Sequence, residues 1–182
     1  MACAVEAALL LVAATVAYAF GQLLLSDLHW SETDFLLGLG ASVPLCALFW
    51  WMMRSSLRSL ARIRRLLIGS LRSHFASWSL LRLGFLSTLA GLSEEVFFRS
   101  VVQGTFTAFF GSAVGLAAAS ILFGCAHLVT GAYGIIAGAI GMYLGLLWLA
   151  GDNLLIPIVT HATYDFAALV YLLRVWSPVV PE

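Results

Sequence analysis

Six ionisable side chains lie within long apolar stretches of this 182-residue chain, and they are the residues that could do chemistry. They are Glu94, Glu95, Arg99, His127, His161 and Asp165, with Tyr164 beside the last of them. A charged group at the centre of a bilayer costs at least about 2.5 kcal/mol on insertion scales. Such residues are tolerated when they meet one another, so we treat them as candidates for one functional site.

The spacing of these residues separates the two neighbouring glutamates. Glu95 and Arg99 are four residues apart and can form an ion pair along one helix face. Glu94 lies about 100° further round the helix and cannot share that geometry well. Arg99 would therefore neutralise one carboxylate and leave the other free to act as a general base or acid. His161 and Asp165 are also four residues apart and face the same way from another helix.

The composition indicates that these residues lie in a membrane protein. Hydrophobic residues make up 62% of the chain and charged residues 10%, with a mean hydropathy of +1.02. A soluble domain is nearer half apolar and one quarter charged. These values exclude a cytosolic enzyme, a nucleic-acid-binding protein and a disordered chain. The apolar runs are continuous rather than alternating, which favours helices over a barrel.

We therefore predict an all-α, polytopic transmembrane helix bundle that forms a single domain over residues 1–182. A span needs about 20 apolar residues, so the length allows about six or seven crossings. The expected spans cover residues 4–25, 35–53, 112–129, 131–150 and 154–173. The apolar segment 77–110 is long for one crossing, and it is either one bent helix or two helices meeting near residue 92. Small residues in segments 111–119 and 134–145 suit close helix packing in lipid.

One basic segment, residues 54–72, holds six of the nine arginines. On a helix, five of these share one face and Arg64 breaks the pattern. The charged face contains Arg54, Arg58, Arg62, Arg65 and Arg72, and the opposite face contains Leu57, Leu60, Leu67, Ile68 and Leu71. This pattern predicts an amphipathic helix at the membrane surface, in contact with anionic lipid headgroups. The positive-inside rule then places this helix and the N-terminus in the cytoplasm.

Three short motifs, taken together, resemble those of a known protease family. They are Glu-Glu-x-x-x-Arg at 94–99, Phe-x-x-x-His at 123–127 and His-x-x-x-Asp at 161–165. Their order and spacing resemble the CAAX prenyl protease-like and bacteriocin-processing family of intramembrane proteases, over about residues 78–174. The resemblance implies a glutamate-dependent endopeptidase, with a catalytic core at 77–174 and accessory spans and the surface helix at 1–76.

The resemblance also implies a role for each residue. Glu94 would activate a water molecule with the help of His127, and His161 with Asp165 would stabilise the oxyanion of the tetrahedral intermediate. The supporting residues Glu95 and Arg99 would hold the site together. Prenyl-protein proteases have Asn where this chain has Asp165, and an ionised Asp cannot donate a hydrogen bond to an oxyanion. Asp165 would act as a donor if protonated, or would instead orient His161.

The expected cofactors and partners follow from the same residues. No HExxH motif is present, and we expect no cofactor; the alternative is a divalent metal such as zinc, bound by Glu94, His127 and His161. The expected partners are the bilayer and a membrane-associated protein or peptide, either lipidated or carrying a leader or a C-terminal sorting tail. We expect no nucleic acid, and a location in the bacterial inner membrane.

Two other classes of function compete with a protease. A non-catalytic scaffold or immunity protein of the same fold has no need for Glu94 and His127 to meet. A small proton-coupled transporter would use buried carboxylates, but transporters of this kind show inverted repeats. No internal repeat is visible in the sequence, so the protease is the leading hypothesis.

Overall fold

The structure is a computed structural model that describes residues 2–21 and 23–176, and within these residues it contains helices and no strands. The helices are α1 (Ala2–Ala19), α2 (Glu32–Arg54), α3 (Arg58–Phe75), α4 (Leu80–Glu95), the π-helix η1 (Val96–Gln103), α5 (Gly104–Phe110), α6 (Ser112–Ala126), α7 (Gly131–Gly151), α8 (Leu155–Val170) and the π-helix η2 (Tyr171–Val175). The predicted all-α class is therefore confirmed.

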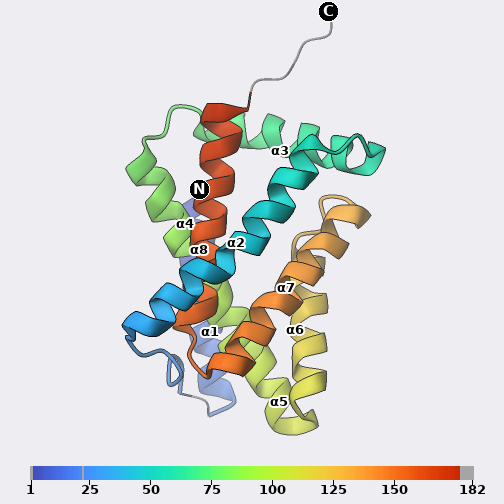
Figure 1. Cartoon of the computed structure of the whole chain (residues 1–182). Helices are drawn as coiled ribbons and strands as arrows, with labels where there is room; N and C mark the ends of the chain where they lie inside the picture. The colour runs from blue at the N-terminus through green and yellow to red at the C-terminus, as the bar shows by residue number, and fades with distance from the viewer. Residues whose placement is uncertain (1, 22, 177–182) are drawn as a thin grey trace, which may run out of the picture.

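Helix α3 lies across one end of the bundle, and the other helices run roughly away from it or toward it (Figure 1). From α3 the chain turns by 118° into the helix Leu80–Phe110 and passes to the opposite end. It returns along α6, leaves again along α7 and comes back along α8 (Figure 1). Arg174 beyond α8 donates a 2.9 Å hydrogen bond to the carbonyl of Ala76, so the end of α8 is tied to the α3–α4 connection.

The number of spans is the part of the fold prediction that is not confirmed. Four helical segments are long and apolar enough to cross a membrane: α1, α2, α7 and Leu155–Val175, and the bent pair formed by α3 and Leu80–Phe110 would make five. Helix α6 is apolar but has 15 residues, fewer than the roughly 20 that a full crossing needs. The expected first span also ran to residue 25, but α1 ends at Ala19; residue 22 lies outside the described part of the chain.

Residues 80–110 form one continuous helix rather than two, which decides between the two readings of the segment 77–110. The middle of this helix, Val96–Gln103, has π-helical hydrogen bonding, which is frequent at functional sites. Gly91 does not break the helix. A Cβ atom at Gly91 would lie 2.9 Å from the backbone nitrogen of Ala162 and 3.0 Å from its Cβ, so the glycine allows α4 and α8 to approach closely.

The basic segment contains the end of one helix and the start of another. Arg54 is the last residue of α2, and the surface helix α3 begins at Arg58, so the two do not share one helix face as predicted. Arg64 donates hydrogen bonds of 2.8 Å and 3.2 Å to the carbonyls of Met53 and Ser55. It therefore caps the end of α2, which explains why this arginine departs from the charged face.

Small residues bring α6 and α7 together, as predicted for the segment 134–145 of α7, whereas Gly124 of α6 lies outside the predicted segment 111–119. A Cβ atom at Gly124 would lie 2.7 Å from the carbonyl oxygen of Gly134, and one at Gly141 would lie 3.1 Å from the Phe123 side chain. Close backbone contact of this kind is a common means of helix association in lipid. It places the end of α6, which His127 directly follows, beside the first half of α7.

Candidate active site

A buried ion pair forms the centre of the site. The Nε atom of Arg99 lies 2.8 Å from Oε2 of Glu95, and both side chains are fully buried. The i,i+4 pair predicted from the sequence is therefore present. The Nη1 atom of Arg99 also donates a 2.8 Å hydrogen bond to the carbonyl of Gly141, which links η1 to α7. A buried pair is stable when its remaining polar atoms are also satisfied, and this contact satisfies part of the guanidinium.

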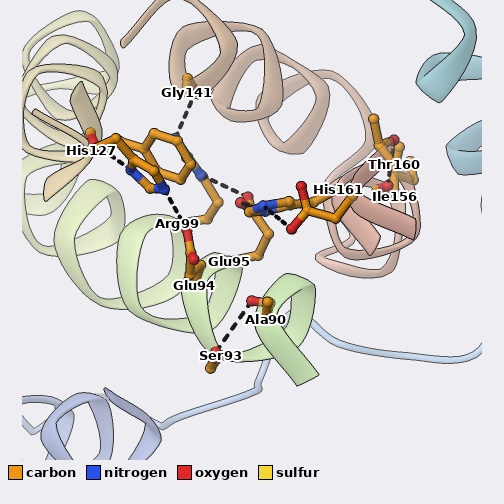
Figure 2. A network of polar contacts seen from close by, with 12 residues as sticks. Ala90, Ser93, Glu94, Glu95, Arg99, His127, Gly141, Ile156, Thr160 and His161 are labelled. Carbon is orange, nitrogen blue, oxygen red and sulfur yellow. Dashed lines mark hydrogen bonds and ion pairs between the residues drawn. The ribbon is translucent and has the colours of Figure 1, made fainter. Parts of the chain in front are cut away.

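His161 connects this ion pair to α8. Its Nδ1 atom lies 2.9 Å from Oε1 of Glu95 (Figure 2). A carboxylate accepts and does not donate, so Nδ1 carries the hydrogen in this contact. The Nε2 atom of His161 then faces Oδ2 of Asp165 at 3.6 Å. Both oxygens of Glu95 are thus occupied by groups from its own helix and from α8.

Glu94 stands apart from that network and faces His127 (Figure 2). Its Oε2 atom lies 3.6 Å from Nε2 of His127, and this oxygen is buried with no hydrogen-bond partner in the described part of the chain. The two glutamates therefore have different environments, as the helix geometry predicted. The distance between Glu94 and His127 is longer than a direct hydrogen bond but suits a water molecule bonded to both.

The orientation of His127 follows from its position just after α6. Its Nδ1 atom lies 2.9 Å from the carbonyl oxygen of Phe123, which can only accept, so Nδ1 is the donor. The neutral imidazole then presents the lone pair of Nε2 to Glu94. The ring of Phe123 stacks on His127 at 4.4 Å between centroids and 20° between planes. Phe123 in the Phe-x-x-x-His motif therefore fixes both the tautomer and the plane of the histidine.

One cavity of about 290 Å³ receives the polar residues from three parts of the chain. Glu94, His127, His161 and Asp165 all line it. Its remaining wall is largely apolar and includes the inner side of α3, where Leu60, Ile63, Leu67, Leu71 and Phe75 line the same space. The apolar face of α3 is therefore turned toward the protein interior. It forms part of the wall of the cavity that the polar residues also line.

A metal ion at this site would need several histidine, cysteine or carboxylate side chains grouped around one point. Within residues 2–21 and 23–176, no three His, Cys, Asp or Glu side chains are grouped so that they could hold a metal ion. In His161 and His127 the Nδ1 atom is bonded to Glu95 and to the carbonyl of Phe123, an arrangement that metal-binding histidines also have, with Nε2 as the ligand. This grouping gives the zinc alternative no support, and that alternative stays a prediction.

The sequence analysis missed one acidic residue that reaches the site. Glu6 on α1 is not among the predicted site residues, but it lines the cavity, and its Oε2 atom accepts a 2.6 Å hydrogen bond from Ser93. Ser93 directly precedes Glu94. The signal was a single acid within an apolar run, but its partner lies 87 residues away and could not be inferred from spacing.

The comparison with protein families identifies the group to which the chain belongs. The model of the family described as type II CAAX prenyl endopeptidase Rce1-like matches residues 76–167. The chain belongs to this family. No curated protein and no solved structure matches the chain. The Rce1-like region contains all three motifs, and the family predicted from them is confirmed.

Membership of the Rce1-like family indicates a CAAX-type intramembrane protease, which is a hydrolase of the membrane. Together with the apolar helices, it makes the chain an integral membrane protein. Residues 76–167 supply the polar side chains of the Glu-Glu-x-x-x-Arg, Phe-x-x-x-His and His-x-x-x-Asp motifs. Helices α1 to α3 precede this region and supply much of the apolar wall of the cavity.

Proposed function

We propose that the protein is a glutamate-dependent intramembrane endopeptidase in which Glu94 is the general base. One observation carries the proposal. The carboxylate of Glu94 has an oxygen free of hydrogen bonds and faces a histidine in a cavity, whereas the carboxylate of Glu95 is bonded on both oxygens. A general base needs such freedom, because its oxygen must reach the proton that it removes.

The proposed reaction starts from a water molecule that donates one hydrogen to Glu94 and the other to Nε2 of His127. Glu94 takes the first proton, and the oxygen of the water forms a bond to the carbonyl carbon of the scissile peptide. The carbonyl oxygen becomes an oxyanion in a tetrahedral intermediate. When the C–N bond breaks, Glu94 returns its proton to the leaving nitrogen. The net reaction adds one water across the peptide bond and leaves Glu94 ionised.

The other polar residues have supporting roles in this proposal. His161 and Asp165 face the same cavity on α8 and line the region in which the tetrahedral intermediate would form. Glu95 and Arg99 position α4, η1, α7 and α8 relative to one another. We expect no cofactor. Residues 77–174 form the catalytic core, and residues 1–76 complete the cavity that receives the substrate.

The substrate is proposed to be a membrane-associated protein or peptide. The cavity is lined largely by apolar side chains, which suits a lipidated tail, a leader segment or a C-terminal sorting tail rather than a folded soluble domain. The family description names CAAX prenyl proteins, and these belong to the first of those classes. We propose that the α3 end, and with it the N-terminus, faces the cytoplasm of a bacterium, because arginines are concentrated in α3 and cytoplasmic segments are rich in basic residues.

The test is a comparison of cells that carry either the wild-type protein or Glu94→Gln. We expect Glu94→Gln cells to accumulate a longer precursor of a membrane protein or peptide, measured by mass spectrometry of the membrane fraction. Glu32→Gln is the matched control, because Glu32 is exposed in the first turn of α2 and should leave processing intact. Identical cleavage products from the wild-type and Glu94→Gln proteins would refute the proposed base and favour a non-catalytic scaffold.

A further inference from the structure

The proposed reaction creates an oxyanion, and the cavity contains few groups that can donate a hydrogen bond to it. The Nδ1 hydrogens of His127 and His161 are bonded to Phe123 and Glu95. Arg99 is fully buried and directed at Glu95 and Gly141. An ionised Asp165 carries no hydrogen to donate. One neutral hydrogen-bond donor that lines the cavity has no role in the proposed reaction.

That donor is the hydroxyl of Tyr133, in the first turn of α7. The side chain lines the same cavity as Glu94 and Asp165, and its hydroxyl interacts electrostatically with both carboxyl groups. Its ring lies 6.4 Å from the ring of His127 at an angle of 63°. Within the described residues the hydroxyl makes no hydrogen bond, so its hydrogen is available.

Tyr133 is also held firmly in place. Its backbone nitrogen donates a 3.1 Å hydrogen bond to Oγ1 of Thr130, the N-cap residue of α7. The edge-to-face contact with His127 restrains the ring on the side of the proposed base. Donors that are held before the reaction starts stabilise a developing charge most effectively, because they need no reorganisation.

A second tyrosine lines the cavity but is placed less favourably. Tyr164 interacts electrostatically with Asp165 and Tyr133, and its ring packs edge-on against Phe49 at 6.3 Å. Tyr133, in contrast, lines the cavity together with Glu94 and Asp165, and its ring contacts that of His127. In the proposed reaction the carbonyl oxygen of the bound peptide lies in this shared cavity.

We propose that Tyr133 is a catalytic residue whose hydroxyl donates a hydrogen bond to the oxyanion of the tetrahedral intermediate. The assignment rests on the proposed function. No proton is transferred from the phenol, which remains neutral throughout; it donates a hydrogen bond that strengthens as negative charge develops on the carbonyl oxygen. Asp165 is then free to orient His161, whose Nε2 atom it faces at 3.6 Å.

The test uses Tyr133→Phe, which removes the hydroxyl and keeps the ring. The full-length protein is reconstituted in vesicles with the precursor that accumulates in Glu94→Gln cells, and kcat and KM are measured. We expect kcat to fall by about 10²- to 10³-fold, as for the loss of one oxyanion donor, with KM nearly unchanged. Tyr143→Phe is the matched control on the same helix, because its hydroxyl donates to the carbonyl of Ala41 at 2.9 Å, and its kcat should stay at the wild-type value.

A rescue experiment separates donation from a packing role. An asparagine at residue 165 carries an amide NH2 group, which can donate a hydrogen bond where an ionised aspartate cannot. The double variant Tyr133→Phe, Asp165→Asn should therefore recover at least tenfold in kcat over Tyr133→Phe. A Tyr133→Phe protein with kcat within twofold of wild type, or a double variant without recovery, would overturn the proposal. If instead Glu94→Gln retains full activity, the proposed function itself fails, so the two failures are distinguishable.

Discussion

The Nδ1 atom of His161 lies 2.9 Å from Oε1 of Glu95 and joins α8 to α4 inside the bundle. The other oxygen of the same carboxylate lies 2.8 Å from Nε of Arg99. Glu95 is therefore fully occupied, whereas the adjacent Glu94 has an oxygen without a hydrogen bond in a cavity. Two neighbouring residues of the same type thus have separate environments, because one helix residue rotates a side chain by about 100°.

Substitution of Glu95 should lower the free energy of unfolding, because Glu95 is part of a buried ion pair. Glu95→Gln leaves the buried guanidinium of Arg99 without its counter-charge, and breaking a buried pair in this way costs roughly 3–5 kcal/mol. We expect this loss in the free energy of unfolding, measured by denaturant titration in detergent micelles. Glu32→Gln at an exposed position should unfold as the wild type does. Unfolding of Glu95→Gln at the wild-type midpoint would show that the pair does not hold the helices together.

Removal of the His127 imidazole should lower turnover without unfolding the protein. His127 is partly exposed in the cavity, so His127→Ala loses little packing, while loss of a residue that positions the water should reduce kcat by about 10²- to 10⁴-fold. The assay is cleavage of the precursor in vesicles. His74→Ala is the control, because His74 is an exposed histidine of α3 that bonds locally to Ser70. Equal activity of the two variants would remove His127 from the mechanism.

The close approach of α4 and α8 can be tested at Gly91. A Cβ atom there would meet the backbone of Ala162 at 2.9 Å, so Gly91→Ala should separate the helices and lengthen the contact between Glu95 and His161. Overpacking of this kind typically costs about 1–3 kcal/mol, and we expect a lower unfolding midpoint together with slower cleavage.

Gly84 on the same helix is the matched control for this substitution. A Cβ atom at Gly84 would lie 3.7 Å from the Phe166 ring, which is an ordinary contact. Gly84→Ala should therefore be neutral or slightly stabilising, since alanine has the higher helix propensity. If both alanine variants behave alike, helix propensity rather than interhelical contact explains the result.

Treatment with strong chelators tests the expectation that no metal is required. Because the proposed base and its histidine act on water directly, cleavage by the purified protein should continue at the untreated rate after incubation with excess EDTA or 1,10-phenanthroline. Loss of activity that is restored by added zinc would replace the proposed water site with a metal site formed by Glu94, His127 and His161.

The exposed arginines of α3 should couple activity to anionic lipid. Arg58, Arg62 and Arg65 are all exposed, and a basic residue at an anionic surface contributes about 1 kcal/mol. We expect the triple glutamine variant to lose the dependence of cleavage rate on the phosphatidylserine content of the vesicles. Arg82→Gln, at an exposed position of α4, should retain it. A triple variant that still responds to anionic lipid would disprove this role for α3.

The contacts made within one helix could be predicted from the spacing of the residues. Helix periodicity fixes which side chains share a face, so the pairing of Glu95 with Arg99 followed from a separation of four residues. Hydropathy likewise predicted an all-α membrane protein, because the length of each apolar run can be counted directly in the sequence. The three motifs similarly pointed to the family, and the match over residues 76–167 confirmed it.

Which helices bring their polar residues together became clear only from the packing of the folded chain. The contact of His161 with Glu95 spans 66 residues, and that of Ser93 with Glu6 spans 87. Such pairings depend on how glycines such as Gly91 let backbones approach, and on the side of α3 that covers the cavity. Periodicity contains no information on the relative placement of separate helices, because that placement results from packing between surfaces distant in the sequence.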